Sequence, residues 1–410
     1  MAGRSKSVTS LPGNSAEAVL PAKRHQRATK HRRVLFVTDF YVENLLAGIV
    51  KYARNAGWML DANMRLHGRF PPVKEAAGIL ATVQSARVRN WLAARQNRPI
   101  VRLIVARFEL PYPAVEADYA AAGRAGARHL LELGHVHLAY YSQFIMRDAR
   151  EAQDGFVAEL AAAGRRPCIL DLSAAFPRRD SFDIVREERH RWLAGELKRL
   201  PKPLAVMCDD DRRALELVAA CNLAGLRVPE DVAILGCDNH WVEQCLSPIP
   251  LSTVDMNFKS IGWKAASLLD QLMQGAAPPP AIIKVPPVGV VARRSTATFV
   301  TDSPAVTAAV VHLREHFRQP LRLAELAHQA GLSERVLETE FKRRVGRSPR
   351  EELRRARLAC AARLLRDTDL KLVAVAAESG FGSAAKLCEN FAKAYGLSPS
   401  IWRQQAKGGF

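Results

Sequence analysis

One helix-turn-helix pattern occurs twice near the end of this 410-residue chain, at 321–346 and again at 370–396. Each copy begins with an amphipathic segment that stops at a glycine, and each leads into Gly-x-Ser-Pro. Glycine readily takes the left-handed conformation that ends a helix, so each copy predicts a helix, a tight turn and a second helix. The doubling constrains the fold strongly, because a single pattern of this kind also occurs in ordinary helical cores.

In the first copy, Gly331 ends the first helix and Ser333 is the predicted N-cap of the second, 334–345. In the second copy, Gly380 and Ser383 take the same places. Apolar residues at four-residue spacing form the inner stripe of each second helix. These stripes are Leu337, Phe341 and Val345 in the first copy and Leu387, Phe391 and Tyr395 in the second, while Arg335, Lys342, Arg343 and Arg344 face outward.

A predicted helix from about 348 to 367 joins the two copies, so that they form one rigid unit. Two recognition helices held in this way would enter successive major grooves, about 34 Å apart on one face of the duplex. The pattern therefore predicts an all-α domain at 305–407 that binds a double-stranded DNA operator.

Residues about 303–405 resemble the DNA-binding domain of the AraC/XylS family. The residues that carry the resemblance are Ala327, Gly331, Ser333, Arg335, Leu337, Phe341, Lys342, Gly346, Ser348 and Pro349 in the first half, and Ala377, Gly380, Phe381, Phe391, Lys393, Gly396, Ser398, Pro399 and Trp402 in the second. The resemblance implies sequence-specific DNA binding. The contact residues that it implies are Ser333, Arg335, Thr339, Lys342, Arg343, Ser383, Ala384, Lys386 and Lys393.

The chain departs from this family where bases and phosphates would be touched. Thr339 and Glu340 stand where such domains often carry arginines, Glu389 replaces a common basic residue, and Lys386-Leu387 replaces the usual Tyr-Phe pair. Acidic side chains on a recognition helix repel phosphate, although glutamate can accept a hydrogen bond from cytosine.

The length and charge of the chain predict further domains. A chain of 410 residues exceeds one compact core. Segment 1–33 has eight basic residues and one acidic residue, and segment 303–410 has 19 basic and 11 acidic residues. The whole chain has 60 basic and 41 acidic residues, so the middle has 33 basic and 29 acidic residues. Basic ends favour a polyanionic partner, whereas the near-neutral middle indicates a different task. A basic surface kept for solubility is the alternative.

Seven cysteines form no Cys-x-x-Cys motif and no zinc spacing with histidine, so they indicate reduced core residues, no metal site and a cytoplasmic protein. No apolar run approaches the roughly 20 residues that cross a membrane. Segment 1–32 is basic and has no apolar stretch of the signal-peptide kind. We therefore predict a disordered tail there, which either touches DNA or has no function.

From Val34 onward, short apolar runs alternate with amphipathic segments, which is α/β periodicity. Continuous apolar strands indicate parallel sheets covered on both faces, and eight candidate strands indicate two sheets. The strand candidates are 34–37, 59–64, 78–83, 100–105, 137–141, 168–172, 204–207 and 232–235, and the helix candidates include 43–55, 120–133, 149–163 and 211–224.

Segments 129–135 and 211–239 resemble the LacI-type periplasmic-binding-protein fold, and the resemblance spans about 33–296. It implies a two-lobed sensor that closes on a sugar, with pocket residues at strand ends. A short, polar linker at 297–304 would follow. The pocket residues that the resemblance and the strand ends favour are Arg150, Asp211, Asp238 and Asn239; a helix cap or a surface ion pair is the alternative role.

The predicted sensor departs from sugar-sensing relatives at two strand ends. Val42-Glu43 replaces an Asp-Arg pair, and Arg102-Leu103-Ile104 replaces a glycine-rich end. Glutamate only accepts hydrogen bonds where arginine only donates them. A different polyol as the effector, or a pocket no longer used, both remain open.

The combined prediction is a transcriptional regulator that needs no cofactor. It would act as a homodimer, respond to a small sugar-like molecule, contact RNA polymerase if it activates, and not associate with membranes. A sugar-active enzyme is the second hypothesis, but no Walker loop, Gly-x-Ser-x-Gly or His-Glu-x-x-His motif is present, and the carboxylates of Asp209-Asp210-Asp211 would diverge. A transport solute-binding protein is the third, and the attached DNA-binding domain opposes it.

Overall fold

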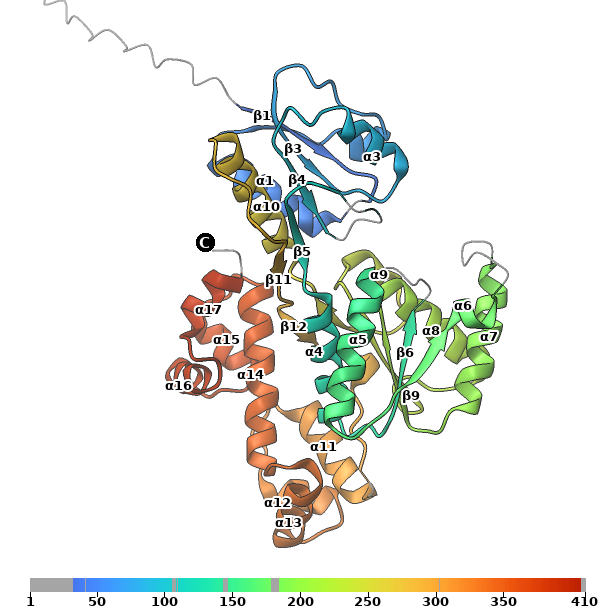
Figure 1. The fold of residues 1–410 in the computed structure, drawn as a ribbon. Helices are drawn as coiled ribbons and strands as arrows, with labels where there is room; N and C mark the ends of the chain where they lie inside the picture. Colours follow the sequence, from blue (N-terminus) through green and yellow to red (C-terminus); the bar gives the residue numbers. More distant parts are fainter. Residues whose placement is uncertain are drawn as a thin grey trace, which may run out of the picture.

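The computed structural model describes residues 32–40, 42–104, 108, 110–142, 147–177, 184–301 and 303–406. The predicted basic tail lies outside the described residues, apart from Arg32. Figure 1 shows two α/β lobes followed by a helical domain that lies beside the second lobe. The predicted fold class, a two-lobed α/β sensor followed by an all-α domain, is confirmed.

The sheet of the first lobe has six parallel strands in the order β11 (Ile283–Val285), β5 (Ala114–Ala117), β4 (Ile100–Leu103), β3 (Ala76–Ala81), β1 (Arg33–Val37) and β2 (Met59–Asp61). Helices α1 (Glu43–Asn55) and α10 (Phe258–Met273) pack together on one face, and α2 (Met64–His67) and α3 (Ala86–Ala93) cover the other. The apolar runs of the central strands are therefore fully buried, as parallel strands covered on both sides require.

The second lobe repeats this plan in the order β12 (Gly289–Val291), β10 (Ser252–Asp255), β9 (Val232–Cys237), β8 (Leu204–Cys208), β6 (His137–Ser142) and β7 (Cys168–Asp171). Only β12 pairs antiparallel. Helices α4 (Tyr119–Glu132) and α5 (Arg147–Ala162) cover one face, and α7 (Arg186–Arg199) and α8 (Asp211–Ala224) cover the other. The short helices α6 (Leu172–Ala175) and α9 (Trp241–Leu246) follow β7 and β9.

Three crossings of the chain join the lobes, after β5, after β10 and between β11 and β12. Each lobe is therefore built from separate parts of the sequence. Residues that follow strands of the two lobes meet where the lobes join, and we expect the ligand cleft of the sensor, the interlobe cleft, at this junction. The sequence predicts eight strands and two sheets. The two sheets are confirmed, but the short strands β5, β10, β11 and β12 were missed, and β2 ends at Asp61 rather than 64.

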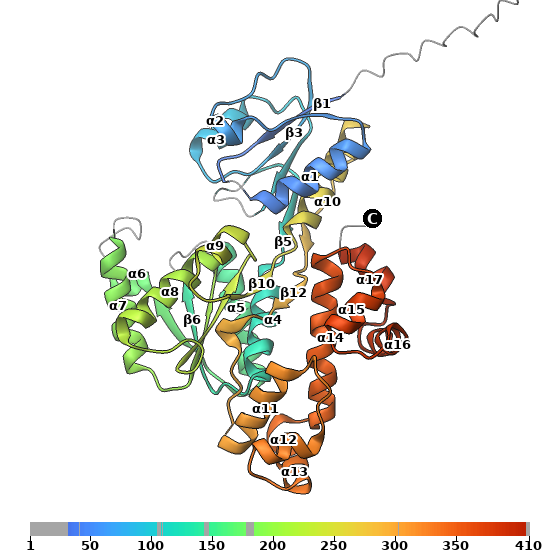
Figure 2. The same ribbon diagram turned by 180° about the vertical axis from the view of Figure 1, so that it is seen from behind.

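The helical domain contains two helix-turn-helix units on either side of a long helix (Figure 2). Its elements are α11 (Pro304–His316), α12 (Leu323–Gln329), α13 (Glu334–Val345), α14 (Pro349–Asp367), α15 (Leu372–Glu378), α16 (Ala384–Tyr395) and α17 (Pro399–Ala406). Ser348 caps α14 through a capping box with Glu351, and Pro349 occupies its first turn, where a missing N–H costs nothing. The predicted connecting helix is thus confirmed.

The segment between the sensor and the helical domain packs against the second lobe. Phe299 is only 3% exposed, and the backbone N–H of Val300 donates to the carbonyl of Leu133 at 2.9 Å. Gly134 makes this approach possible, because an added Cβ would lie 2.1 Å from the carbonyl oxygen of Val300. The segment predicted as a short, polar linker is therefore docked through a buried aromatic ring, which limits independent motion of the two domains.

Candidate DNA interface and ligand cleft

Each predicted recognition helix begins and ends as the sequence indicates. The hydroxyl of Ser333 accepts from the backbone N–H of Val336 and caps α13, and Ser383 caps α16 in the same way through Lys386. Gly346 and Gly396 end the two helices in the left-handed conformation. Loss of such a serine cap typically costs about 1 kcal/mol, so these residues define where the two helices start.

The inner stripes of both helices are buried, with one exception. Leu337, Phe341, Leu387 and Phe391 have no exposed surface. Tyr395 was predicted inside, but it is 40% exposed and packs at a tilt against Phe391, with ring centroids 4.4 Å apart. It lies on the last turn of α16, at the rim of the core where that core meets the sensor.

The outward face of α13 carries the predicted contacts Arg335, Thr339, Lys342 and Arg343, all of which are exposed. Glu340 lies between them and the core, where it accepts hydrogen bonds from Arg343 and Arg344 at 2.8 Å each. Arg344 was predicted to face outward, yet its side chain is only 16% exposed because of this pairing. Glu340 therefore orients two arginines as well as reducing the positive charge of the helix.

The outward face of α16 carries Lys386 and Lys393, which are exposed, and Ala384, which is half-buried at its first turn. Glu389 accepts a hydrogen bond from Lys393 at 2.7 Å, and this contact lowers the pKa of the glutamate. Lys386 thus remains the clearest cation for DNA on this helix, and its backbone N–H already fixes the position of the helix start through Ser383.

The predicted ligand residues lie at or beyond strand ends of the second lobe. Asp238 and Asn239 come directly after β9, and both have positive φ angles of 101° and 57°. Such conformations are uncommon outside glycine and mark a tightly specified loop. Burial raises the pKa of Asp238 well above its usual range, and the charge of Asp210 adds to the rise.

Asn239 already bonds to three neighbours. Its side-chain oxygen accepts from Arg293 at 2.8 Å, its amide donates to Asp255 at 3.1 Å, and its backbone N–H donates to Thr253 at 3.1 Å. The sequence did not reveal this network, because its members are distant along the chain. Asn239 therefore links the cleft to β10 and to the segment after β12.

Asp211 takes a structural position beneath the cleft rather than a place in it. It is 0% exposed, and its two oxygens accept from the hydroxyl of Thr253 at 2.6 Å and the backbone N–H of His240 at 2.9 Å. Burial raises its pKa to about 8. This geometry does not support the direct ligand contact that was expected of Asp211. The N-cap of α8 is the neighbouring Asp210.

Arg150 lies exposed on the first turn of α5, beyond β6. The sequence identified Glu43 as a departure from relatives, but it did not predict the contacts that residues of the first lobe make with the second. The carboxylate of Glu43, at the start of α1, accepts a hydrogen bond from the indole N–H of Trp241, at the start of α9. The guanidinium of Arg212 lies 5.6 Å from the ring centre of Phe40, which follows β1.

A buried ionic cluster lies where β4 and β5 approach the second lobe. Glu116 is fully buried and pairs with Arg102, with Arg147 at 2.8 Å and with Lys284 at 3.3 Å. Arg147 belongs to the second lobe and the other three to the first. Arg102, which replaces a glycine-rich strand end, therefore holds Glu116 within the first lobe, and Arg147 reaches the same carboxylate from the second lobe. Truncating one partner would leave a buried charge unpaired.

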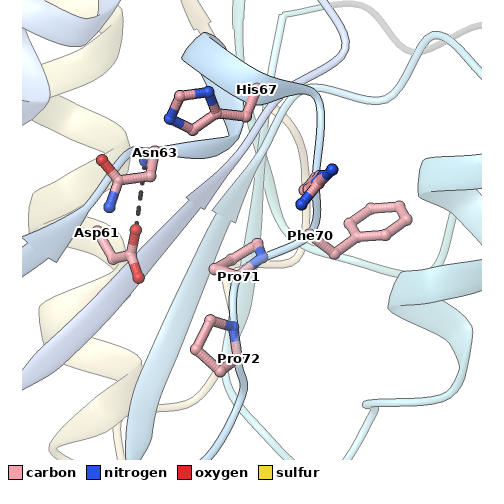
Figure 3. Close-up of a pocket in the computed structure, with 7 residues that line it drawn as sticks. Asp61, Asn63, His67, Phe70, Pro71 and Pro72 are labelled. Carbon is pink, nitrogen blue, oxygen red and sulfur yellow. Dashed lines mark hydrogen bonds between the residues drawn. The ribbon is translucent and has the colours of Figure 1, made fainter.

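A cavity of about 540 Å³ lies at the edge of the first lobe, beside β2. Figure 3 shows Asp61, Asn63 and His67 on one side of it and Pro71 and Pro72 on the other. The backbone N–H of Asn63 donates to Asp61 at 3.2 Å. None of the predicted ligand residues lines this cavity.

Comparison with known proteins agrees with both parts of the chain. Residues 127–296 match a periplasmic binding protein-like domain, and residues 326–405 match a helix-turn-helix domain. The xylose operon regulatory protein of Escherichia coli K12 is 31% identical over 389 residues, which cover 92% of this chain and 97% of that protein. The corresponding protein of Haemophilus influenzae is 26% identical over 301 residues, 71% of this chain and 75% of that protein.

Two solved structures share the fold. The structure of the xylose-binding transcription activator xylR aligns with a TM-score of 0.56 at 24% identity, over 92% of this chain and 99% of that one. A regulatory protein of the LacI family from Chloroflexus aggregans aligns with a TM-score of 0.50 at 20% identity, over 64% of this chain and 98% of that one.

The fold, the two matched domains and these relatives define a DNA-binding transcriptional regulator with a sensor domain of the sugar-controlled class. The similarity along nearly the whole length of the Escherichia coli protein is more specific. The chain belongs to the family of the xylose operon regulatory proteins.

Among the described residues, no helix is long and apolar enough to span a bilayer, and no three His, Cys, Asp or Glu side chains are grouped as a metal site.

Proposed function

We propose that α13 and α16 insert into successive major grooves of an operator and that Arg335 and Lys386 contact it directly. The observation that carries this proposal is the pair of serine-capped, glycine-terminated helices fixed to one 19-residue helix, α14. Both cations are exposed, and neither is held by a carboxylate within the described residues. Ser333, Thr339, Lys342, Arg343, Ser383, Ala384 and Lys393 would complete the interface.

The test is a gel-shift titration on operator fragments selected from the genome. Arg335→Ala and Lys386→Ala should each weaken binding by about 1–3 kcal/mol if they contact bases, or lower the salt dependence if they contact phosphate. Arg199→Ala on α7, which is exposed and far from both helices, is the control. Removal of 303–410 should abolish binding. Unchanged affinity after that deletion would refute the proposal.

We further propose that the interlobe cleft binds a small sugar or polyol, with Asp238, Asn239 and Arg150 on the second lobe and Glu43 on the first. Hydrogen-bond acceptors on both sides of the cleft and the nearby rings of Phe40 and Trp241 support a ligand with several hydroxyl groups. Glu43 accepts only, where relatives offer a donor, which argues for a different hydroxyl pattern from that of xylose. An unused, diverged pocket is the alternative.

Thermal unfolding with xylose and a panel of pentoses, hexoses and polyols distinguishes a sugar-binding pocket from an unused one. The cognate sugar should raise the melting temperature of the wild type, and Asp238→Ala should remove the rise without changing operator affinity. The same rise in Asp238→Ala would exclude that pocket, and no rise with any sugar would favour the unused pocket.

We infer that the protein acts in the cytoplasm as a homodimer, whose four helix-turn-helix units would read two half-sites, and that it contacts RNA polymerase if it activates. A catalytic role is disfavoured by the bonding of the three consecutive acids. Asp209 accepts from Ser142, Asp210 caps α8, and Asp211 is held by Thr253. Sugar turnover by the purified protein would contradict this view.

A further inference from the structure

A second cavity lies between the sensor and the helical domain. It has a volume of about 570 Å³, within the range of small-molecule sites. Its walls come from α4 and the β12 region of the sensor and from α11, α14, α16 and α17 of the DNA-binding domain. Figure 2 shows α14 running alongside these sensor elements. A molecule bound there would touch both domains at once.

The walls of this cavity, which we call the interdomain cavity, are strongly cationic. Two acidic side chains, Glu132 and Glu352, face six arginines. Three of the arginines are held by carboxylates: Arg314 by Glu352 at 2.7 Å, Arg355 by Glu132, and Arg366 by Asp255 at 3.8 Å. The six arginines are Arg293, Arg314, Arg318, Arg355, Arg363 and Arg366.

Two of these arginines are available for a ligand. Arg318 and Arg363 are exposed, and neither pairs with a carboxylate among the residues that the structure describes. Within the described part of the chain, the guanidinium of Arg363 has one hydrogen bond, a 4.0 Å contact to the sulfur of Cys360. Guanidinium groups present planar forks of donors that match the oxygens of a phosphate group.

A histidine in the wall of the cavity is held in its neutral form. His129 lines the interdomain cavity, and burial, followed by the charges of Arg314 and Arg355, lowers its pKa to about 3. The imidazole is therefore neutral at pH 7 and does not add to the charge. An anion entering the cavity would relieve the repulsion among the arginines, which a neutral sugar would not do.

Aromatic rings supply the apolar part of the lining. Tyr395 and Trp402 face the cavity from the second helix-turn-helix unit, with ring centroids 6.1 Å apart, and Phe317 lines it from the end of α11. Tyr395 is the residue that the sequence placed in the core. Its exposure on the last turn of the recognition helix α16 gives a ligand in this cavity direct contact with the DNA-reading element.

We propose that the interdomain cavity binds a small organic phosphate, with Arg318 and Arg363 on the phosphate group and the aromatic rings on the organic part. This site is distinct from the sugar cleft and does not depend on it. Binding would stabilise the docked arrangement of sensor and α16, so the affinity of the protein for its operator would change with the concentration of the phosphate ester.

The test uses the full chain and two matched pairs of probes: AMP with adenosine, and ribose 5-phosphate with ribose. At low salt, at least one ester should raise the melting temperature while its uncharged partner does not. Arg318→Gln and Arg363→Gln, alone and together, should weaken binding of that ester about tenfold or more for the double variant, because hydrogen bonds to charged groups are strong. Arg354→Gln, exposed on α14 outside the cavity, should leave it unchanged.

Three outcomes would overturn the proposal. Equal shifts with an ester and its uncharged partner would show that phosphate is not recognised. An ester whose binding survives both arginine substitutions would bind elsewhere. No shift with either ester, combined with weaker operator binding by the double variant, would assign the two arginines to the DNA backbone. The single variants keep the test informative if the double variant unfolds.

Discussion

At the scale of single residues, buried carboxylates dominate the cleft side of the second lobe. Asp209, Asp211 and Asp238 all follow strand ends, and burial raises the pKa of each. From the sequence, such acids are equally consistent with ligand contacts and with structural supports. The structure separates them by their hydrogen bonds: those of Asp211 are both internal, whereas Asp238 remains half-buried beside the cleft.

Asp211 should make the stability of the sensor depend on pH. Its pKa is about 8 in the folded protein and about 3.9 in an unfolded chain. The folded state therefore retains a proton that the unfolded state releases, so the stabilisation is complete below about pH 4 and is lost as the pH rises towards 8. Relative to Asp211→Asn, the wild type should lose about 1.4 kcal/mol per pH unit between pH 5 and 7.

Urea unfolding of the wild type and the variant at several pH values measures this difference. Asparagine retains the shape of the acid, with an oxygen that accepts from the backbone N–H of His240. Asp231→Asn is the control, because its exposed pairing with Arg227 lowers the pKa of Asp231 to about 2, outside the tested range. Parallel curves for wild type and Asp211→Asn would contradict the assigned protonation.

At the scale of elements, the repeated helical units follow from local rules and the sensor sheets follow only in part. Serine caps, glycine stops and four-residue spacing act within a few residues, so the bounds of α13 and the start of α14 could be predicted closely. Strands β5, β10, β11 and β12 have three or four residues each and owe their place to pairing partners far along the chain. Their short runs carry too little periodicity to be recognised.

The candidate sites likewise contain some residues that local sequence predicts and others that depend on contacts distant along the chain. Exposure of Arg335 and Lys386 follows from helical periodicity, and the positions of Asp238 and Asn239 follow from a strand end. Glu43 contacts Trp241 in the other lobe, and Arg102 pairs with Glu116 on the neighbouring strand. No local sequence pattern predicts either contact. Tyr395 was misplaced because the spacing that predicts burial does not tell where the core ends.

Gly380, in the turn of the second unit, should be irreplaceable. Its φ is 79°, and an added Cβ would lie 2.7 Å from the carbonyl oxygen of Phe317 and 2.9 Å from the Cα of Arg318. These are backbone atoms that cannot rotate away. Gly380→Ala should therefore lower the stability of the helical domain by at least about 1–2 kcal/mol, the usual cost of a left-handed alanine alone.

Gly382→Ala is the matched control, because no atom lies within 4 Å of the added Cβ. Thermal unfolding and operator titration of both variants give the comparison. The control variant should behave as wild type within about 0.5 kcal/mol. Equal stability of the two variants would mean that the turn does not need its left-handed residue.

At the scale of the whole molecule, a polar route connects the ligand cleft with the DNA-binding domain. Asn239 beside the cleft donates to Asp255 at 3.1 Å, and the same carboxylate oxygen lies 3.8 Å from the guanidinium of Arg366 near the end of α14. The docked segment at Phe299 and the contact between Glu132 and Arg355 hold the two domains together on either side of this route. The side chain of Asp255 therefore connects the Asn239 loop directly with α14.

Asp255→Asn should weaken the coupling between the effector and the operator while sparing both binding sites. The amide retains the shape of the carboxylate but loses its charge attraction to Arg366. The sugar should still raise the melting temperature, whereas the sugar-dependent change in operator affinity, typically about 1–3 kcal/mol for coupled sites, should shrink. Operator titrations with and without sugar measure the coupling, and Asp231→Asn, which lies before β9 and pairs with Arg227 instead, serves as the control. Full coupling in Asp255→Asn would show that the signal does not pass through Asp255, and would assign it to the docked linker or to the contact between Glu132 and Arg355.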